Sequence, residues 1–171
     1  LVELNISNVK IAKKSKDHDS CIISEICVRL ELAMKVRNLK LSNLDMNSPS
    51  MMRSLRALLE SCAYLQYLNI SNCNIQLDQL VQVTSDLRQC CKLEYCNIGG
   101  NKISSCRLAQ EDEKGLFVHE GSMKEVKANL ALELVENICH IIESSQFSMK
   151  YLDISDLGLT NRHLRMIARS L

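Results

Sequence analysis

The chain has 171 residues, which suits one domain, and its 46% apolar and 24% charged residues make an ordinary globular composition. The formal net charge of +1 excludes a strong global field toward nucleic acid or an anionic membrane surface. There is no run of about 18 apolar residues and no signal-peptide pattern, so we expect neither a membrane span nor secretion.

An eleven-residue pattern recurs five times along the chain. In order, its copies are LVELNISNVKI from residue 1, VRNLKLSNLDM from 36, LQYLNISNCNI from 65, LEYCNIGGNKI from 93 and MKYLDISDLGL from 149. The fourth, sixth and eleventh positions are apolar in every copy. This short alternation predicts a β-strand whose fourth and sixth side chains point inward, and the repetition predicts parallel pairing of successive strands.

Segments with apolar residues at helical spacing lie between the predicted strands. In chain order they are residues 20–34, 48–62, 77–91 and 126–144, and the last residues, up to Leu171, are expected in a fifth helix. Pro49 is expected in the first turn of its helix, with Ser48 as the N-cap. Cys91 is expected on the apolar side of the third of these helices.

Residues 104–125 interrupt the repeat. The fourth and fifth copies start at 93 and 149, about twice the spacing of their neighbours, and the excess is polar and contains glycine. One interpretation is a loop inserted in the fourth repeat, which we favour, and the other is a degenerate repeat. A long insertion in a solenoid is often functional.

The pattern L-x-x-L-x-L-x-x-N/C-x-L, carried by copies about 28 residues apart, resembles the leucine-rich repeat superfamily. The helical segments make the chain similar to its ribonuclease-inhibitor-like subclass, which includes Ran GTPase-activating proteins, tropomodulin tails and sensor domains of NOD-like receptors. The resemblance implies an α/β solenoid, or horseshoe, with a parallel β-sheet on the concave face and α-helices on the convex face. It also implies an intracellular location.

The nine cysteines agree with a reducing compartment, because an odd number cannot pair completely and a chain of this length needs no disulfide staples. Two glycosylation sequons, at Asn5 and Asn69, fall on the predicted sheet and we interpret them as chance matches. We therefore expect a cytoplasmic or nuclear protein. Neither end of the predicted solenoid shows a polar cap, so we expect about five repeats of a longer solenoid, a fragment of a larger protein.

The sequence indicates no enzyme, cofactor or metal site. It has no Gly-rich phosphate loop, no Gly-flanked nucleophilic Ser and no His-Glu-x-x-His pattern. The one local group of thiols is Cys90, Cys91, Cys96 and Cys106. Zinc needs about four converging ligands, whereas Cys91 and Cys96 occupy positions expected in the core.

The second, third, fifth and seventh positions of the copies should line the concave face. Three of the four tyrosines, Tyr67, Tyr95 and Tyr151, share the third position; Tyr67 and Tyr95 should stand side by side, and Tyr151 joins them if 104–125 is a loop. The predicted protein-binding residues are Tyr67, Tyr95, Tyr151, Arg37, Lys40, Asn69, Asn97 and Asp153. The alternative is that the tyrosines form a lateral ladder that only stabilises the sheet.

The predicted function is a non-catalytic scaffold module that binds a protein partner of unknown identity through the concave sheet. No small-molecule substrate is expected, and nucleic acid is disfavoured because basic and acidic residues are mixed on the strands. One alternative is a regulatory or substrate-recognition part of a larger complex, such as a GTPase activator, NOD-like receptor or ubiquitin-ligase receptor. Another is a structural spacer in a large assembly.

Overall fold

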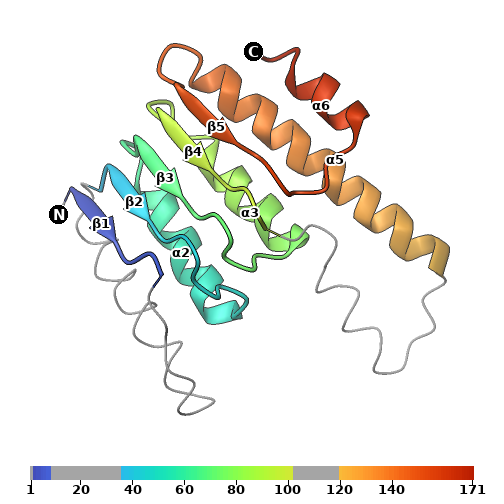
Figure 1. Cartoon of the computed structure of the whole chain (residues 1–171), viewed down its shortest axis with the longest axis horizontal. Coiled ribbons are helices and arrows are strands. Elements are labelled where there is room, and N and C mark those ends of the chain that lie inside the picture. The colour runs from blue at the N-terminus through green and yellow to red at the C-terminus, as the bar shows by residue number, and fades with distance from the viewer. Residues whose placement is uncertain (1, 9–35, 102–119) are drawn as a thin grey trace.

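The computed structural model describes residues 2–8, 36–101 and 120–171. In these residues, five short parallel strands form one sheet in chain order: β1 (Glu3–Asn5), β2 (Asn38–Lys40), β3 (Tyr67–Asn69), β4 (Tyr95–Asn97) and β5 (Tyr151–Asp153). The helices α2 (Pro49–Ser61), α3 (Leu77–Leu87) and α5 (Glu120–Ser144) form a second layer behind the sheet, and α6 (Asn161–Ile167) lies beside α5 (Figure 1). The predicted α/β architecture, with a parallel sheet on one face and helices on the other, is confirmed.

The strands pair so that equal positions of the eleven-residue pattern stand opposite each other. Leu4, Leu39, Leu68, Cys96 and Leu152, the fourth positions, form one continuous row across the sheet. β5 pairs directly with β4, so the sheet has no strand between them. Most of the predicted insertion 104–125 and the predicted helix 20–34 lie outside the described residues, while residues 120–125 belong to α5, which therefore begins earlier than predicted.

The core lies between the sheet and the helices, and the inward strand positions form its sheet side. The fourth and sixth side chains of the three central strands are at most 1% exposed; they are Leu39, Leu41, Leu68, Ile70, Cys96 and Ile98. Their equivalents on β1 and β5 are only half-buried, because each of these end strands is paired with another strand of the sheet on one side only. On the helix side, Leu55, Leu58 and Leu59 of α2 are fully buried.

Each strand ends in the same turn. The residue at the eighth position has a positive φ in every copy: Asn8 (63°), Asn43 (60°), Asn72 (55°), Gly100 (70°) and Asp156 (54°). Asn, Asp and Gly are the residues that adopt this left-handed conformation at least cost. The common turn redirects the chain from the sheet toward the helical layer.

Two details of the helix ends differ from the sequence-based expectations. Ser48 is the N-cap of α2 and Pro49 its first residue, as predicted, but Ser48 makes no side-chain cap hydrogen bond; its hydroxyl pairs with that of Ser50 at 2.8 Å. The placement of Cys91 on the apolar side of a helix is wrong, because α3 ends at Leu87. Beyond it, Cys90 is the buried thiol and Cys91 is exposed.

No helix in the described parts of the chain is both long enough and apolar enough to cross a membrane.

Candidate functional site on the concave sheet

A row of three stacked tyrosine rings crosses the sheet. The parallel register places Tyr67, Tyr95 and Tyr151 opposite one another on β3, β4 and β5. The ring centroids of Tyr67 and Tyr95 lie 4.0 Å apart with the planes 5° from parallel, and those of Tyr95 and Tyr151 lie 4.4 Å apart with the planes at 4°. The rings therefore cover one another; Tyr67 and Tyr95 are half-buried and Tyr151 is exposed.

A cation lies at the end of this tyrosine row that faces β2. Lys40, at the fifth position of β2, has its Nζ 5.0 Å from the centroid of the Tyr67 ring, a distance at which a cation is attracted to the π face. The same ammonium group donates to Oε1 of Glu3 at 2.7 Å. The hydrogen bond from Lys40 lowers the pKa of Glu3, and the same bond raises the pKa of Lys40.

The opposite end carries a carboxylate. Tyr151 is 45% exposed, and its hydroxyl group lies 3.5 Å from Oδ2 of Asp153. The charge of Asp153 raises the pKa of Tyr151, and burial raises that of Tyr67, so these phenols are neutral donors at neutral pH. Hydrogen bonds from Ser155 lower the pKa of Asp153, which is ionised there.

Three of the polar side chains at the fifth position already make hydrogen bonds within the protein. Oδ1 of Asn69 accepts from the backbone N–H of Ser71 at 3.1 Å, and the equivalent oxygens of Asn97 and Asp153 accept in the same way two residues ahead. These are Asx turns that help to end the strands. Asn97 is also buried, with a relative exposure of 9%. The structure therefore places all three beside the tyrosine row, with their turn-forming oxygens already engaged.

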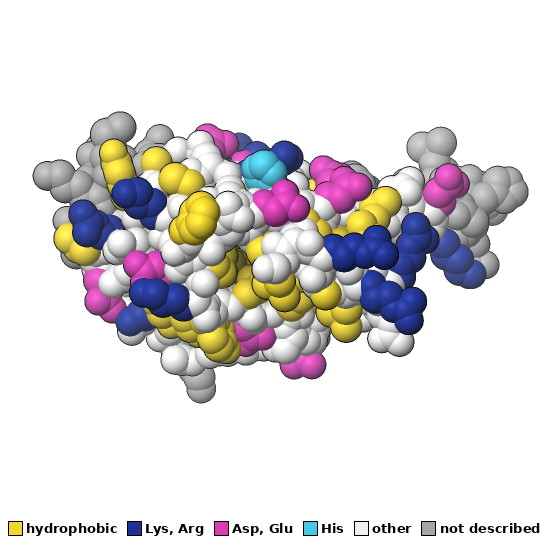
Figure 2. Space-filling view, turned by 90° about the horizontal axis from the view of Figure 1, so that it is seen from above, with side chains coloured by type: hydrophobic (Ala, Val, Ile, Leu, Met, Phe, Trp, Pro, Cys, Tyr) yellow, Lys and Arg dark blue, Asp and Glu magenta, His cyan; other side chains and the backbone are white. Residues whose placement is uncertain are grey.

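The second position adds charged groups, not all of which the sequence-based list included. Arg37, which was among the predicted residues, directly precedes β2 and is exposed. Lys150 and Glu94, which were not, form an ion pair at 2.5 Å between neighbouring strands. Their shared column in the repeat alignment was the available signal. Pairing of this kind cancels charge locally, and on the face seen in Figure 2 basic, acidic and hydrophobic side chains are intermixed.

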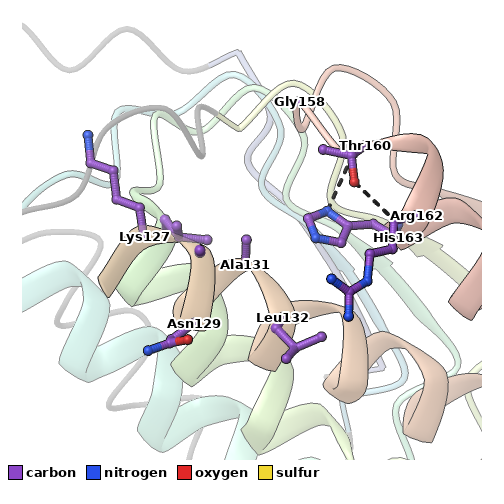
Figure 3. A pocket seen from close by; sticks show the side chains of 10 residues that line it. Lys127, Asn129, Ala131, Leu132, Gly158, Thr160, Arg162 and His163 are labelled. Atoms are coloured by element: carbon purple, nitrogen blue, oxygen red, sulfur yellow. Dashed lines mark hydrogen bonds between the residues drawn. The ribbon is translucent and has the colours of Figure 1, made fainter. Parts of the chain in front are cut away.

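Two cavities lie away from the sheet. One, of about 620 Å³, separates α5 from the turn that leads into α6, with Ala131 and Leu132 on one side and Arg162 and His163 on the other (Figure 3). Nδ1 of His163 accepts from the backbone N–H of Thr160, which makes the histidine part of the α6 cap. The other, of about 810 Å³, lies between α3, α5 and α6 and includes His140.

No group of three His, Cys, Asp or Glu side chains that could hold a metal occurs among residues 2–8, 36–101 and 120–171. Cys106, one of the four thiols considered in the sequence, lies outside these ranges. Burial raises the pKa of Cys96 to about 12 and that of Cys90 to about 12, so neither supplies a thiolate at neutral pH.

Comparison with known proteins supports the fold. No family model and no curated protein matches the sequence. Among solved structures, the tropomodulin C-terminal domain from Caenorhabditis elegans is similar, with a TM-score of 0.64 at 13% sequence identity, over 100% of this chain and 82% of that one. The five-stranded parallel sheet and this likeness together establish a leucine-rich repeat type of fold for the chain.

Proposed function

We propose that this chain is a non-catalytic, intracellular interaction module of the ribonuclease-inhibitor-like subclass, and that it binds a protein partner through the concave sheet. The observation that carries the proposal is the stacked row of Tyr67, Tyr95 and Tyr151 across strands β3, β4 and β5 of that sheet. The leucine-rich repeat fold supports it, because solenoids of this kind present extended concave binding surfaces.

The tyrosine row has the physical properties of a binding hot spot. Tyrosine supplies a large contact area and a hydrogen-bonding group, and it is enriched among the residues that dominate interface energetics. Stacking holds the three rings before a partner arrives, so little side-chain entropy remains to be lost on binding. Arg37, Lys40 and Asp153 would form a polar rim around the row.

The competing explanation is that the row only stabilises the sheet, since aromatic side chains on neighbouring strands attract one another. The two roles predict different effects of removing the hydroxyl groups. Replacing Tyr67, Tyr95 and Tyr151 by Phe preserves the stack and deletes only the hydroxyl groups, which a partner could bind. A purely structural ladder should be insensitive to this change, whereas a binding surface should lose affinity.

The test is quantitative capture from a cell lysate, with four versions of the chain as bait. They are the wild type, the triple Tyr→Phe variant, a Tyr95→Ala variant and a Tyr64→Ala control, which removes an exposed tyrosine outside the row. We expect a protein retained by the wild type and the control, and lost from the other two baits at equal melting temperature. Equal capture by all four baits, or capture by none, would contradict concave-face binding and favour the structural spacer.

A further inference from the structure

The parallel register holds Tyr67 and Tyr95 face to face, an arrangement that free aromatic rings do not favour. Their centroids lie 4.0 Å apart and their planes are 5° from parallel. Isolated aromatic rings prefer an offset or edge-to-face packing, because the negative faces of two rings repel each other. Here the two tyrosines are paired across β3 and β4, whose backbones are held at the spacing of a sheet, about 4.8 Å. The backbone therefore imposes the stack.

The two rings also point in the same direction, so that equivalent carbon atoms face each other. Both side chains leave neighbouring strands at the same register position. At the other end of the rings, burial and then the hydroxyl group of Tyr95 raise the pKa of Tyr67, so the two hydroxyl groups are neighbours as well. Each ring carbon of Tyr67 thus lies close to its counterpart in Tyr95, near the contact distance of two carbon atoms, about 3.5 to 4.0 Å.

The surroundings of this pair favour contact between the two rings over contact with another molecule. Lys40 covers the outer face of Tyr67, with its Nζ 5.0 Å from the centroid, and Tyr151 stacks on the outer face of Tyr95. Tyr67 and Tyr95 are half-buried, whereas Tyr64, which lies outside the tyrosine row, is 61% exposed. The pair also lies inside the sheet, since β3 and β4 each pair with strands on both sides.

Phenol rings stacked in this way are arranged for oxidative coupling. A one-electron oxidant takes an electron from a tyrosine ring and the phenol proton passes to water, which leaves a neutral phenoxyl radical. The unpaired electron is shared by the oxygen and the ortho and para carbons, and the para carbon is blocked by the Cβ atom. The p orbital of each ortho carbon is perpendicular to the ring, so it points at the same carbon of the stacked ring. Coupling therefore needs little movement of either side chain.

We propose that Tyr67 and Tyr95 form a modification site, at which a one-electron oxidant, such as the ferryl haem of a peroxidase, joins the two rings into dityrosine. Two oxidations, each removing one electron and one proton, give two neighbouring phenoxyl radicals, and a carbon–carbon bond forms between their ortho carbons. The ortho carbons then lose their protons while the two oxygens take up protons, which restores both phenols. The protein loses two hydrogen atoms in all, the oxidant gains two electrons, and β3 becomes covalently joined to β4.

This inference does not rest on the proposed function. It needs only the geometry of the two rings, so dityrosine can form whether or not a partner binds the concave sheet. Capture from a lysate and the oxidation experiment below can therefore fail separately.

The test is oxidation of the dilute chain, with its exposed thiols alkylated, by photochemically generated ruthenium(III) tris(bipyridine), which removes single electrons. The monomer is isolated and digested, and the joined peptides that contain Tyr67 and Tyr95 are identified by mass spectrometry from the loss of two hydrogen atoms. The fluorescence of dityrosine gives the yield. Tyr95→Phe keeps the stack and deletes one phenol, and Tyr64→Phe is the matched control, because it deletes an exposed phenol outside the tyrosine row.

We expect equal yields of intrachain dityrosine from the wild type and Tyr64→Phe, and yields at least about tenfold lower from Tyr67→Phe and Tyr95→Phe. Tyr151→Phe should keep the product, and unfolding in urea should abolish the preference for this pair. Equal yields from the wild type and Tyr95→Phe would overturn the proposal, as would dityrosine found only between chains. A product lost in Tyr151→Phe but kept in Tyr67→Phe would also overturn it, because the cross-link would then belong to the other pair of the row.

Discussion

The side chain of Asn101 joins two repeats by hydrogen-bonding to their backbone groups. It is fully buried at the ninth position of the fourth copy, where its Oδ1 accepts from the N–H groups of Cys73 and Ile75 at 3.1 and 3.2 Å. Its Nδ2 donates to the carbonyls of Ile70 and Ile98 at 3.0 and 2.8 Å. One side chain therefore satisfies four backbone groups that have no access to water, which makes it a residue whose loss the fold cannot repair locally.

Asn101→Ala should lower the free energy of unfolding by about 2 to 4 kcal/mol, because it leaves several buried donors and acceptors without partners. Urea unfolding followed by circular dichroism measures the change. Asn129→Ala, on the exposed surface of α5, is the matched control and should shift stability by at most about 0.5 kcal/mol. A similar cost for both variants would show that the network around Asn101 contributes little.

The ninth position also shows what a sequence pattern leaves open. The repeat alignment marks Cys73 and Asn101 as equivalent, and both are buried, but they work differently. The thiol of Cys73 donates to the carbonyl of Leu41, in the preceding repeat, at 3.0 Å. The side chain of Asn101 instead makes hydrogen bonds to four backbone groups. Hydrogen-bond partners between repeats depend on backbone geometry about 30 residues away, which periodicity does not encode.

At the scale of elements, an ion pair connects two neighbouring helices. Arg56 of α2 donates through Nε to Oδ2 of Asp86 on α3 at 2.7 Å, and through Nη2 to Oδ1 at 3.2 Å. The Asp86 side chain is only 10% exposed, so this forked contact is partly shielded from water. Such two-point pairing fixes the relative position of the helices better than a single surface contact does.

Arg56→Lys should cost about 1 kcal/mol of stability, since a lysine cannot make both contacts. A double-mutant cycle of Arg56→Ala and Asp86→Ala should give a coupling energy of about 1 to 2 kcal/mol in chemical unfolding. The pair of Lys150 and Glu94, whose side chains are 75% and 37% exposed, offers a comparison in which we expect no measurable coupling. Equal coupling in the two cycles would refute the role of burial.

The boundaries of elements were harder to predict than their existence. Strand positions followed from an apolar pattern with a period of two, and all five strands pair in the predicted register. The end of α3 could not be predicted from the apolar pattern. Cys91 continues the helical spacing beyond Leu87, where the chain already turns toward β4. The α3 cap was also missed: the backbone N–H of Gln76, the N-cap residue, donates to Oε1 of Gln79 at 3.1 Å, and neither residue is a typical helix cap.

At the scale of the whole molecule, buried thiols make stability depend on alkaline pH. Burial raises the pKa of Cys73 from 9.0 to about 11, and those of Cys90 and Cys96 to about 12. These folded-state values lie above the unfolded ones, so the folded chain keeps protons that the unfolded chain releases. The associated stability is complete below about pH 9 and falls as the pH rises toward 12.

The free energy of unfolding should therefore decline steadily between about pH 9 and pH 11 in urea titrations under reducing conditions. Cys96→Val, which fills the fourth position without a titrating group, should make the decline shallower. Gln89→Ala, on the surface nearby, should leave the slope unchanged. A Cys96→Val slope equal to that of the wild type would contradict the assignment.

The candidate site was predicted in its composition but not in its geometry. The third column of the repeat named Tyr67, Tyr95 and Tyr151, and parallel pairing made them neighbours. The face-to-face stack and the contact of Lys40 with Glu3 depend on side-chain conformations across strands, which sequence spacing does not determine. The use of Asn69 and Asn97 in turns likewise became visible only with the backbone conformation.

The stacked rings also give the protein a built-in optical signal. The chain has no tryptophan, two weakly absorbing phenylalanines and four tyrosines, and three of the four tyrosines belong to one parallel array with centroid spacings of 4.0 and 4.4 Å. Transitions of rings this close couple, and the near-ultraviolet circular dichroism should report chiefly on the concave sheet. Binding of a partner to the concave sheet could then be followed on the unlabelled protein.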